Sequence, residues 1–444
     1  MSGGGGKLIR DAVHGDIGFS ALEMAVVDTR PVQRLRGIRQ LGASHLVYPS
    51  AMHTRFEHSL GTAWLAKRLL AELAARGTPL PAEDEVAVPL AALLHDVTHW
   101  PFGHTFEDER RLFVRHDEDE ERLARSLAEP ALAAALAASG VGARVRELLT
   151  ARVGTAAEII AGVVGADLLD YLRRDAYGTG LRQDYDDRIF RSFISLDGRL
   201  TVDLQKRGLL RHDVLSELIH LLRVRYNLTE RVYYHHAKMV AGAMISKALE
   251  LALEAGRIRR DEIYDLADES FLWLLAQRLA DQPGAAALLD DLACRRLYKR
   301  VYQTSLAGWQ VQGVSTAQQA ELAARYHYDI AGRRAAEERL AAALGLDPAA
   351  VLIYCPAPTM QLKESTVPVC VEPGRATTLA ELGSAEVSSL ADKYRGLWKL
   401  LVCVRRGHEA SFARAGELAA ELFGAANLLD LHQRGGLAFG SAGD

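Results

Sequence analysis

Helical periodicity governs the first 255 residues of this 444-residue chain. Residues 58–76 carry apolar residues at helical spacing, and residues 84–99 follow an acidic start that favours a helix N-terminus. Pro101 ends this second helix, because proline has no backbone N–H to donate. Further helices are predicted over residues 118–137, 143–151, 156–175 and 212–253.

Strand signals are fewer and lie mostly late in the chain. The turn of a short antiparallel pair is predicted at Asp197-Gly198, a dipeptide that favours a two-residue hairpin. The expected strands are Phe193–Leu196, Leu200–Leu204, Val351–Cys355, Val367–Val371 and Leu400–Val404. The sequence therefore predicts a mainly α protein, with a helical catalytic core over residues 1–255. A smaller mixed α+β C-terminal lobe, residues 256–444, is expected to pack on this core and to serve oligomerisation or regulation.

Composition narrows the class of protein. Lys and Arg total 53 against 57 Asp and Glu, a net charge of −4 that disfavours nucleic acid as the partner of the whole chain. No apolar run reaches about 18 residues, and no signal segment opens the chain, so we expect neither a membrane span nor secretion. The four cysteines are far apart and form no CxxC pair, which suits a reducing compartment. We expect a cytoplasmic protein.

Histidines are concentrated near the start of the chain, where eight of the 15 come before residue 117. The segment His53–His58 enters the first predicted helix, and His95-Asp96 lies inside the second. His99 follows one turn later, and His104 comes after the proline break. Asp167 lies on a later predicted helix.

This pattern has two interpretations. A single buried histidine on a helix is usually a hydrogen-bonded core residue. The ordered set HxxxxH, HDxxH and Asp167 is harder to explain in this way, because such residues are costly to bury without a partner or a metal ion. Imidazoles and carboxylates presented together suit a divalent metal at a hydrolytic centre. His95 has apolar neighbours, so we favour the metal site.

Three strings carry a family resemblance: HTRFEHSLGTAWLAKRL at 53–69, ALLHDVTHWPFGHTFE at 92–107 and DLLDYLRRDAYGTG at 167–180. They resemble the HD-domain metal-dependent phosphohydrolases, and more narrowly their branch of deoxynucleoside triphosphate triphosphohydrolases. The resemblance begins at KLIRDAVHG (7–15) and includes RYNLTERVYYH (225–235). It implies an HD-type helical core.

The resemblance also implies a reaction and a cofactor. Deoxynucleoside triphosphates would be hydrolysed at the α-phosphorus by a water that the metal activates, releasing deoxynucleoside and inorganic triphosphate. The matching metal ligands are His58, His95, Asp96 and Asp167. Mixed nitrogen and oxygen ligation suits Mn, Fe, Co, Ni or Zn, with Mg as a partner of the substrate phosphates.

Further active-site histidines of the family match His99, His104 and His116. His104 is the candidate acid that protonates the departing 5′-oxygen, because a general acid must gain and lose a proton near working pH, as the histidine residue type can. Glu107 would orient His104 if that turn is helical. For His116, which precedes an acidic run, a solvated loop is the alternative.

Substrate contacts are implied for two arginines and several neighbouring residues. Arg55 and Arg225 match phosphate-contacting residues, with a surface salt bridge as the alternative. Tyr171 and Asp175 match substrate contacts, and their spacing from Asp167 keeps them on one helical face. The matching sugar and base contacts are Gln40, Leu41, Tyr233 and His235.

One departure from the family keeps rival functions open. After Asp167 the family usually has Lys or Arg, but this chain has Leu168, and losing a cation would weaken a triphosphate clamp. A phosphohydrolase acting on nucleoside monophosphates, modified nucleotides or another phosphate ester is therefore the first alternative. The second is a nuclease or nucleic-acid-binding protein that uses Arg110, Arg111 and Arg115.

A regulatory site is implied as well. Positions that bind a guanine nucleotide between subunits in the family match Lys7, Asp28, Gln33 and Arg36. Asp28 also fits a turn residue, and Arg36 an exposed helix charge. We expect activation by GTP or dGTP and a homo-oligomer, either a dimer or a tetramer.

Overall fold

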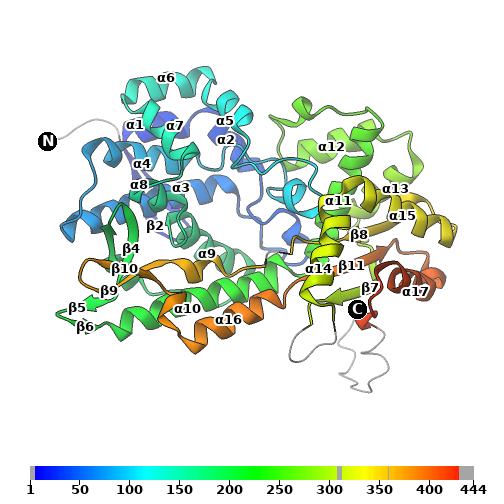
Figure 1. Ribbon diagram of the computed structural model, residues 1–444. Coiled ribbons are helices and arrows are strands. Elements are labelled where there is room, and N and C mark those ends of the chain that lie inside the picture. Colours follow the sequence, from blue (N-terminus) through cyan, green and yellow to red (C-terminus); the bar gives the residue numbers. More distant parts are fainter. Residues whose placement is uncertain (1–5, 308–312, 359, 430–444) are drawn as a thin grey trace.

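The computed structural model describes residues 6–307, 313–358 and 360–429, and within them it is mainly helical with small sheets, as predicted (Figure 1). The helices are α1 (Ala21–Val27), α2 (Arg30–Arg34), α3 (Arg55–Ala75), α4 (Ala82–Leu94), α5 (Glu120–Leu127), α6 (Pro130–Ser139), α7 (Gly142–Thr150), α8 (Thr155–Ala161), α9 (Ala166–Thr179), α10 (His212–Leu228), α11 (His236–Glu254), α12 (Asp268–Arg278), α13 (Pro283–Ala293), α14 (Thr316–Ala323), α15 (Ile330–Leu344), α16 (Ala385–Arg395) and α17 (Phe412–Phe423). The strands are β1 (Lys7–Asp11), β2 (Gly15–Phe19), β3 (Phe193–Leu196), β4 (Arg199–Asp203), β5 (Gln205–Lys206), β6 (Leu209–Leu210), β7 (Lys299–Ser305), β8 (Val351–Tyr354), β9 (Pro368–Glu372), β10 (Arg375–Thr378) and β11 (Lys399–Val404).

The predicted strands are all present. β3 and β4 pair antiparallel around Asp197 and Gly198, both at positive φ (51° and 72°), as a two-residue hairpin turn requires. The central C-terminal sheet has the order β7-β11-β8 and is antiparallel throughout. The hairpins β1-β2 and β5-β6 and the strands β7 and β10 were not predicted.

Residues far apart in the sequence share the second sheet, whose order is β10-β9-β4-β3. β9 pairs parallel with β4. The segment after residue 360 therefore returns to the part of the molecule that contains α3 and α9. Figure 1 shows β9, β10 and α16 beside α10, away from the cluster of α12, α13 and α15.

Three predicted helices are in fact interrupted. Residues 118–137 form α5 and α6, with Pro130 at the first turn of α6, where a missing N–H costs nothing. Residues 156–175 are divided at Gly162–Gly165, where a Cβ on either glycine would lie within 3 Å of the Glu158 carbonyl oxygen. The 212–253 helix is broken by a π-helical turn, Thr229–Tyr233.

The predicted 84–99 helix is too long, because α4 ends at Leu94. His95 is its C-cap, and Asp96 lies in the following turn rather than inside a helix. Phe102 and Gly103, at φ 61° and 62°, reverse the chain here, and the Phe102 amide donates to Asp268 at 2.6 Å. The residues after α4 are thereby tied to the N-terminus of α12.

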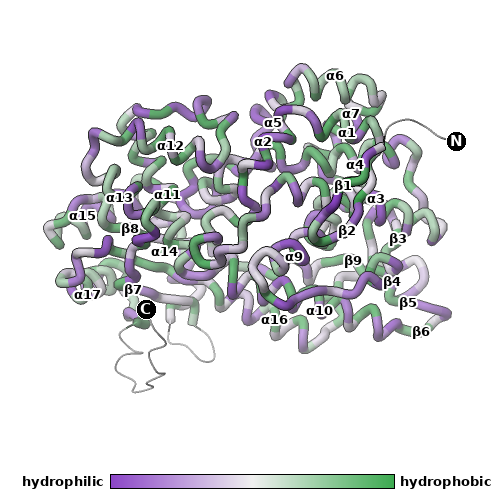
Figure 2. The backbone as a smooth tube through the Cα atoms, turned by 180° about the vertical axis from the view of Figure 1, so that it is seen from behind, coloured by the Kyte–Doolittle hydropathy of each residue, from purple (hydrophilic) through white to green (hydrophobic). Residues whose placement is uncertain are grey.

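Two hydrophobic clusters enclose this turn. One contains the apolar faces of α3, α4 and α9, and the other is built on α11, α12 and α13. Trp100, Phe102 and Phe106 insert into the second cluster, so the segment after α4 is anchored in both halves of the molecule. Hydrophobic residues run along α4 in Figure 2, consistent with its burial against neighbouring helices, whereas α6 buries only Leu132, Ala135 and Leu136.

Among the described residues no single helix is long and apolar enough to cross a membrane. The pair Gly142–Thr150 and Thr155–Thr179 passes together on length and composition but is bent by 67°.

Candidate active site

Four side chains from three parts of the chain converge at the end of α4. The Nε2 atom of His58, on α3, lies 3.3 Å from that of His95 and 3.0 Å from Asp167 Oδ1, on α9. Ligand atoms of these three residues all lie within 4.8 Å of one another. Asp96 lies beside them, with its carboxylate 3.4 Å from His95 and 3.9 Å from His58. This donor set of imidazoles and carboxylates fits a divalent cation.

The two imidazoles are oriented by hydrogen bonds on their far sides. His95 Nδ1 lies 2.7 Å from the Ala92 carbonyl oxygen, which can only accept, so Nδ1 carries the proton and Nε2 faces the site with a lone pair. His58 Nδ1 lies 2.7 Å from Asp170 Oδ2 in the same way. Such outer contacts fix the ring and its tautomer at metal sites.

Asp170 connects the site to the surrounding core. Its carboxylate accepts hydrogen bonds from Nε and Nη2 of Arg174, at 2.8 and 2.9 Å. It also lies 2.6 Å from His14 Nε2. Arg174 also donates to Asp11 at 2.9 Å. Burial opposes ionisation, but the Arg174 guanidinium outweighs it and holds the pKa of Asp170 well below its usual range. Asp170 therefore carries a negative charge toward His58.

A glycine makes this arrangement possible. A Cβ at Gly61, on α3, would lie 1.9 Å from Asp170 Oδ1 and 2.5 Å from Arg174 Nη2. Helix propensity alone would make Gly61→Ala stabilising by roughly 0.5–1 kcal/mol. We instead expect it to lower the free energy of unfolding by about 1–3 kcal/mol and to weaken metal binding, because the clash displaces the partner of His58.

Chemical denaturation and metal titration measure both effects. The control is Ala74→Gly, at an exposed position of the same helix, which should lose helix propensity alone and keep metal affinity. A stabilised Gly61→Ala protein with unchanged metal affinity would contradict the packing argument.

The protonation of His58 makes metal binding pH-dependent. Burial disfavours its charged form, but hydrogen bonds to Asp167 and Asp170 prevail and raise the pKa of His58 to about 10 in the metal-free protein. A metal ligand must give up this proton. We therefore expect metal affinity to increase with pH up to about 10, with close to one proton released per ion near pH 7. Calorimetric titration in buffers of different ionisation enthalpy counts the protons, and a pH-independent affinity would contradict this expectation.

The raised pKa of His58 also determines how its contribution to the free energy of unfolding depends on pH. A raised folded-state pKa means that the His58 contribution is complete below its unfolded pKa of about 6.5. That contribution is lost as the pH rises through the folded-state value of about 10.

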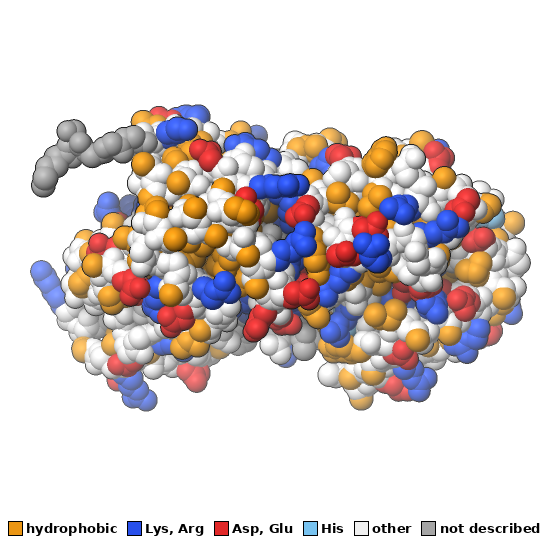
Figure 3. Space-filling model, turned by 90° about the horizontal axis from the view of Figure 1, so that it is seen from above, with side chains coloured by type: hydrophobic (Ala, Val, Ile, Leu, Met, Phe, Trp, Pro, Cys, Tyr) orange, Lys and Arg blue, Asp and Glu red, His pale blue; other side chains and the backbone are white. Residues whose placement is uncertain are grey.

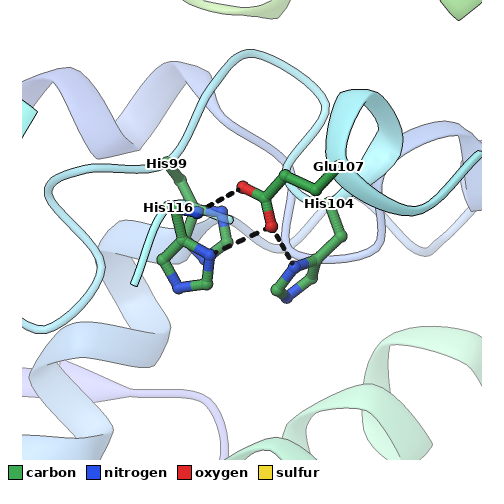
Figure 4. Close-up of side chains that lie close together, drawn as sticks. All are labelled: His99, His104, Glu107 and His116. Carbon is green, nitrogen blue, oxygen red and sulfur yellow. Dashed lines mark hydrogen bonds and ion pairs between the residues drawn. The ribbon is translucent and has the colours of Figure 1, made fainter. Parts of the chain in front are cut away.

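A second cluster lies next to the first and contains His99, His104, Glu107 and His116 (Figure 4). His104 caps a π-helical turn, Thr105–Glu109, which places its Nδ1 2.9 Å from Glu107 Oε2. His116 donates its backbone N–H to Glu107 Oε1 at 3.0 Å, and its ring is stacked on His99 with centroids 3.4 Å apart. His116 is 9% exposed, so the solvated-loop alternative does not hold.

Charges within this cluster are distributed unevenly. Burial opposes ionisation of Glu107, but His116 and His104 outweigh it and hold the pKa of Glu107 well below its usual range. Burial lowers the pKa of both His99 and His116, and nearby Arg55 lowers that of His99 further. The His104 side chain is 42% exposed, whereas that of Glu107 is fully buried. His104 is thus an accessible imidazole whose Nδ1 is hydrogen-bonded to the buried Glu107 carboxylate.

Arg55 and Asp96 join the two clusters. Arg55 Nη1 donates to Asp96 Oδ2 at 2.7 Å, and His99 Nε2 lies 3.1 Å from Asp96 Oδ1. Arg55 is 3% exposed, so the surface salt bridge considered from the sequence is excluded. A Cβ on Gly103 would lie 2.8 Å from Arg55 Nη2, so the glycine leaves room for the guanidinium.

The expected substrate contacts form a neighbouring group. Tyr171 lies 6.5 Å from His58 between ring centroids, and the Arg225 guanidinium lies 5.1 Å from the rings of both Tyr171 and Tyr233. Tyr233 donates to Asp175 Oδ2 at 2.6 Å. Arg225 is also paired with Glu364 at 3.2 Å, a residue from the C-terminal half.

Other expected contacts are placed as follows. Gln40 and Leu41 precede the short 3₁₀ segment Gly42–Leu46, and Gln40 Oε1 is buried with no hydrogen-bond partner among the described residues. His235 is the N-cap of α11 and accepts from the Ala237 amide at 3.3 Å. Leu168 is 5% exposed and belongs to the core cluster, so position 168 supplies no phosphate contact in this chain.

The residues expected to bind a regulatory nucleotide lie on β1 (Lys7), at the C-cap of α1 (Asp28), on α2 (Gln33) and in the 3₁₀ segment Leu35–Gly37 (Arg36). Lys7, Asp28 and Arg36 are exposed. Gln33 donates to the Val27 carbonyl at 2.8 Å and accepts from Arg36 Nε at 2.8 Å. Arg36 also covers the Phe56 ring at 3.5 Å.

Two of the three arginines considered for a nuclease are paired with carboxylates, whereas Arg111 is exposed and its guanidinium lies 4.9 Å from the Tyr328 ring. Arg110 is fully buried and paired with Glu250 and Glu337. Arg115 contacts Asp117 at 3.0 Å, within the acidic run.

Sequence reasoning did not assign several residues of the site. Asp170 and Arg174 follow Asp167 by three and seven residues, a helical spacing that signals a shared face. His53, whose Nε2 lies 2.8 Å from Asp175 Oδ1, is the first residue of the HTRFEH string. Glu364 carries no local signal, because only the tertiary fold brings it to Arg225.

Comparison with known proteins identifies the fold. Residues 55–175 match the HD domain, and residues 214–427 match the HD associated region. An uncharacterized protein of Methanocaldococcus jannaschii is 32% identical over 304 residues, which cover 66% of this chain and 59% of that protein. The deoxynucleoside triphosphate triphosphohydrolase SAMHD1 of Danio rerio is 28% identical over 353 residues, covering 67% of this chain and 56% of the relative. The chain thus spans less than two thirds of the length of these relatives.

Solved structures show the same fold. A hypothetical protein from Aquifex aeolicus aligns with a TM-score of 0.67 at 22% identity, covering 93% of this chain and all of the other. A phosphohydrolase from Bacteroides thetaiotaomicron aligns with a TM-score of 0.64 at 22% identity, covering 90% of this chain. An HD domain implies a divalent metal ion, and the His and Asp cluster agrees with this. The chain therefore belongs to the HD-domain family, and it is related to the SAMHD1 triphosphohydrolases at about 28% identity over two thirds of its length.

Proposed function

We propose that the chain hydrolyses deoxynucleoside triphosphates to deoxynucleoside and inorganic triphosphate. The observation that carries this proposal is that two clusters adjoin: the metal-ligand set around His58 and the His104–Glu107 pair, linked through Asp96 and His99. One cluster can activate water and the other can protonate a leaving group. The similarity to SAMHD1, named a deoxynucleoside triphosphate triphosphohydrolase, supports this choice of substrate.

The metal ligands would be His58, His95, Asp96 and Asp167. A divalent cation held there supplies Lewis acidity, which lowers the pKa of water and offsets phosphate charge. Asp167 has a side chain that is 34% exposed, more than the other three, so the open side of the centre lies toward this residue. Arg55 binds Asp96 and presents its remaining N–H groups toward a phosphate oxygen.

His104 would donate a proton from Nε2 to the departing 5′-oxygen. Glu107, kept ionised by its two histidine neighbours, holds the Nδ1–H and so fixes the ring with Nε2 outward. His99 stays neutral because of burial and Arg55, which avoids a second positive charge beside His104. Tyr171 and Arg225 would bound the substrate on the other side of His58.

One observation favours a second candidate, hydrolysis of another phosphate ester such as a nucleoside monophosphate. A cavity of about 340 Å³ reaches His95 and His116, and its lining includes the acidic residues 117–120. These carboxylates repel a polyphosphate, and Leu168 adds no cation.

A panel of the four deoxynucleoside triphosphates, with products separated by ion-exchange chromatography, distinguishes the two functions. We expect deoxynucleoside and triphosphate in equal amounts. Release of inorganic phosphate, or turnover of monophosphates alone, would favour the second candidate.

Regulation by a guanine nucleotide is part of the same proposal. Lys7, Asp28 and Arg36 are exposed and available to a nucleotide at the contact of two subunits in a homo-oligomer. Addition of GTP or dGTP should then raise both the turnover of a second nucleotide and the oligomer mass in light scattering. Unchanged turnover and mass would contradict this part.

A further inference from the structure

An arginine-rich cavity lies behind the backbone of His99. It encloses about 260 Å³, and its charged lining consists of Arg30, Arg34, Arg122, Arg125, Glu129 and Asp265. None of the residues assigned above to metal, catalysis, substrate or regulation lines it. Seen from above, a hollow separates the two halves of the molecule, and Lys and Arg side chains lie along its rim (Figure 3).

Arg122 is buried and Arg34 is half-buried, and among the described residues their guanidinium groups donate to neutral partners. Arg122 is 2% exposed, and its Nη2 donates to the carbonyl oxygens of His99 and Tyr264, both at 3.0 Å. Its Nε and Nη1 are buried with no hydrogen-bond partner among the described residues. Arg34 donates only to carbonyl oxygens, those of Leu266 at 3.1 Å, Val97 at 3.4 Å and His99.

The two carboxylates of the lining are engaged elsewhere. Asp265 pairs with Arg125 at 3.0 Å, and Glu129 accepts the Leu132 amide at 2.8 Å as the N-cap of α6. Within the described part of the chain, no carboxylate lies within 4.0 Å of the guanidinium nitrogens of Arg34 or Arg122. Burial lowers the pKa of Arg34 to about 10, and burial together with Arg34 lowers that of Arg122. Buried positive charge without a counter-ion is costly.

We propose that this cavity is a binding site for a phosphate-class anion, held by Arg122 Nε and Nη1 and by the charges of Arg34 and Arg30. Guanidinium groups suit phosphate oxygens through paired, charge-assisted hydrogen bonds. Cavities that enclose drug-sized ligands measure about 300–1,000 Å³. At about 260 Å³ this cavity fits inorganic phosphate or a short polyphosphate better than a whole nucleotide.

The site is positioned to act on the candidate active site. Arg34 and Arg122 both donate hydrogen bonds to the His99 carbonyl oxygen. The His99 ring in turn packs on His116 and contacts Asp96. An anion that draws the two guanidinium groups toward itself would shift His99. This consequence rests on the proposed function, whereas the binding itself does not.

Calorimetric titration of the full chain with inorganic phosphate, tripolyphosphate and AMP tests the proposal. We expect one saturable step with a Kd below about 1 mM for phosphate or tripolyphosphate, and weaker binding of AMP. The step should persist in His95→Ala, which disables the metal centre. It should disappear in Arg122→Met, and Arg30→Glu should weaken it about fivefold or more.

Arg122→Met replaces a partly satisfied buried cation with an apolar side chain of similar length, so we expect it to fold. Arg30 is exposed, so Arg30→Glu should fold and tests the cavity without disturbing the core. The control is Arg188→Glu, at an exposed site outside the cavity, which should bind the anion as the wild type does. Tighter binding of AMP would assign the site to the phosphate of a nucleotide. The proposal is overturned if no step is seen, if His95→Ala removes it, or if Arg122→Met retains it. Absence of deoxynucleotide hydrolysis would leave these outcomes unaffected.

Discussion

Replacement of His95 or Asp167 by alanine is expected to reduce kcat on the substrate by at least about 1,000-fold. Each side chain contributes a ligand atom to a group that lies within 4.8 Å, and neither has a neighbour that can take its place. The loss should be accompanied by loss of bound metal, measured by elemental analysis of the purified protein.

The matched control is His212→Ala, at an exposed histidine at the start of α10. It should retain wild-type kcat and metal content. All three variants should show cooperative thermal unfolding, so that lost activity is not lost fold. Full activity in metal-depleted His95→Ala or Asp167→Ala would refute the assignment of the metal centre.

Replacement of His104 by glutamine should lower kcat by about 10²–10⁴-fold and leave metal content unchanged. The ring is 42% exposed and held by Glu107, a geometry suited to proton donation and not to ligation of the ion at His58. The decisive readout is a substrate whose leaving group needs no proton. With thymidine 5′-p-nitrophenyl phosphate, and nitrophenol as the product, the defect of His104→Gln should shrink to less than about tenfold.

The same substrate provides the comparison that separates the two roles. His95→Ala should remain inactive on the nitrophenyl ester, because activation of water is still required. If His104→Gln were equally defective on both substrates, His104 would be a structural residue and not the acid.

Local sequence indicated the candidate metal ligands and histidines of the site, but not Asp170, Arg174 or Glu364 and not the geometry. The string HDVTHWPFGH gave His95, Asp96, His99 and His104, yet it predicted a helix through residue 99. The helix ends at Leu94, and the chain then reverses at Phe102 and Gly103, which take positive φ, while Asp268 accepts the Phe102 amide. Asp268 is more than 160 residues away in sequence, so helical periodicity could not reveal it.

Contacts between distant parts account for the other differences. The Asp170 network depends on His14 and Asp11, which the β1-β2 hairpin delivers to α9. Glu364 reaches Arg225 because the C-terminal chain returns to pair β9 with β4. By contrast, the β3-β4 hairpin was predictable because its turn residues determine it locally.

The account's central claim is that the centre formed by His58, His95, Asp96 and Asp167 directs water to the α-phosphorus of a deoxynucleoside triphosphate. Hydrolysis of dGTP in ¹⁸O-labelled water, followed by mass spectrometry of the products, tests this most directly. We predict a single ¹⁸O atom in inorganic triphosphate, none in deoxyguanosine, and no products with His95→Ala. Label in a deoxynucleoside monophosphate or in inorganic phosphate, or unchanged hydrolysis by His95→Ala, would contradict the claim.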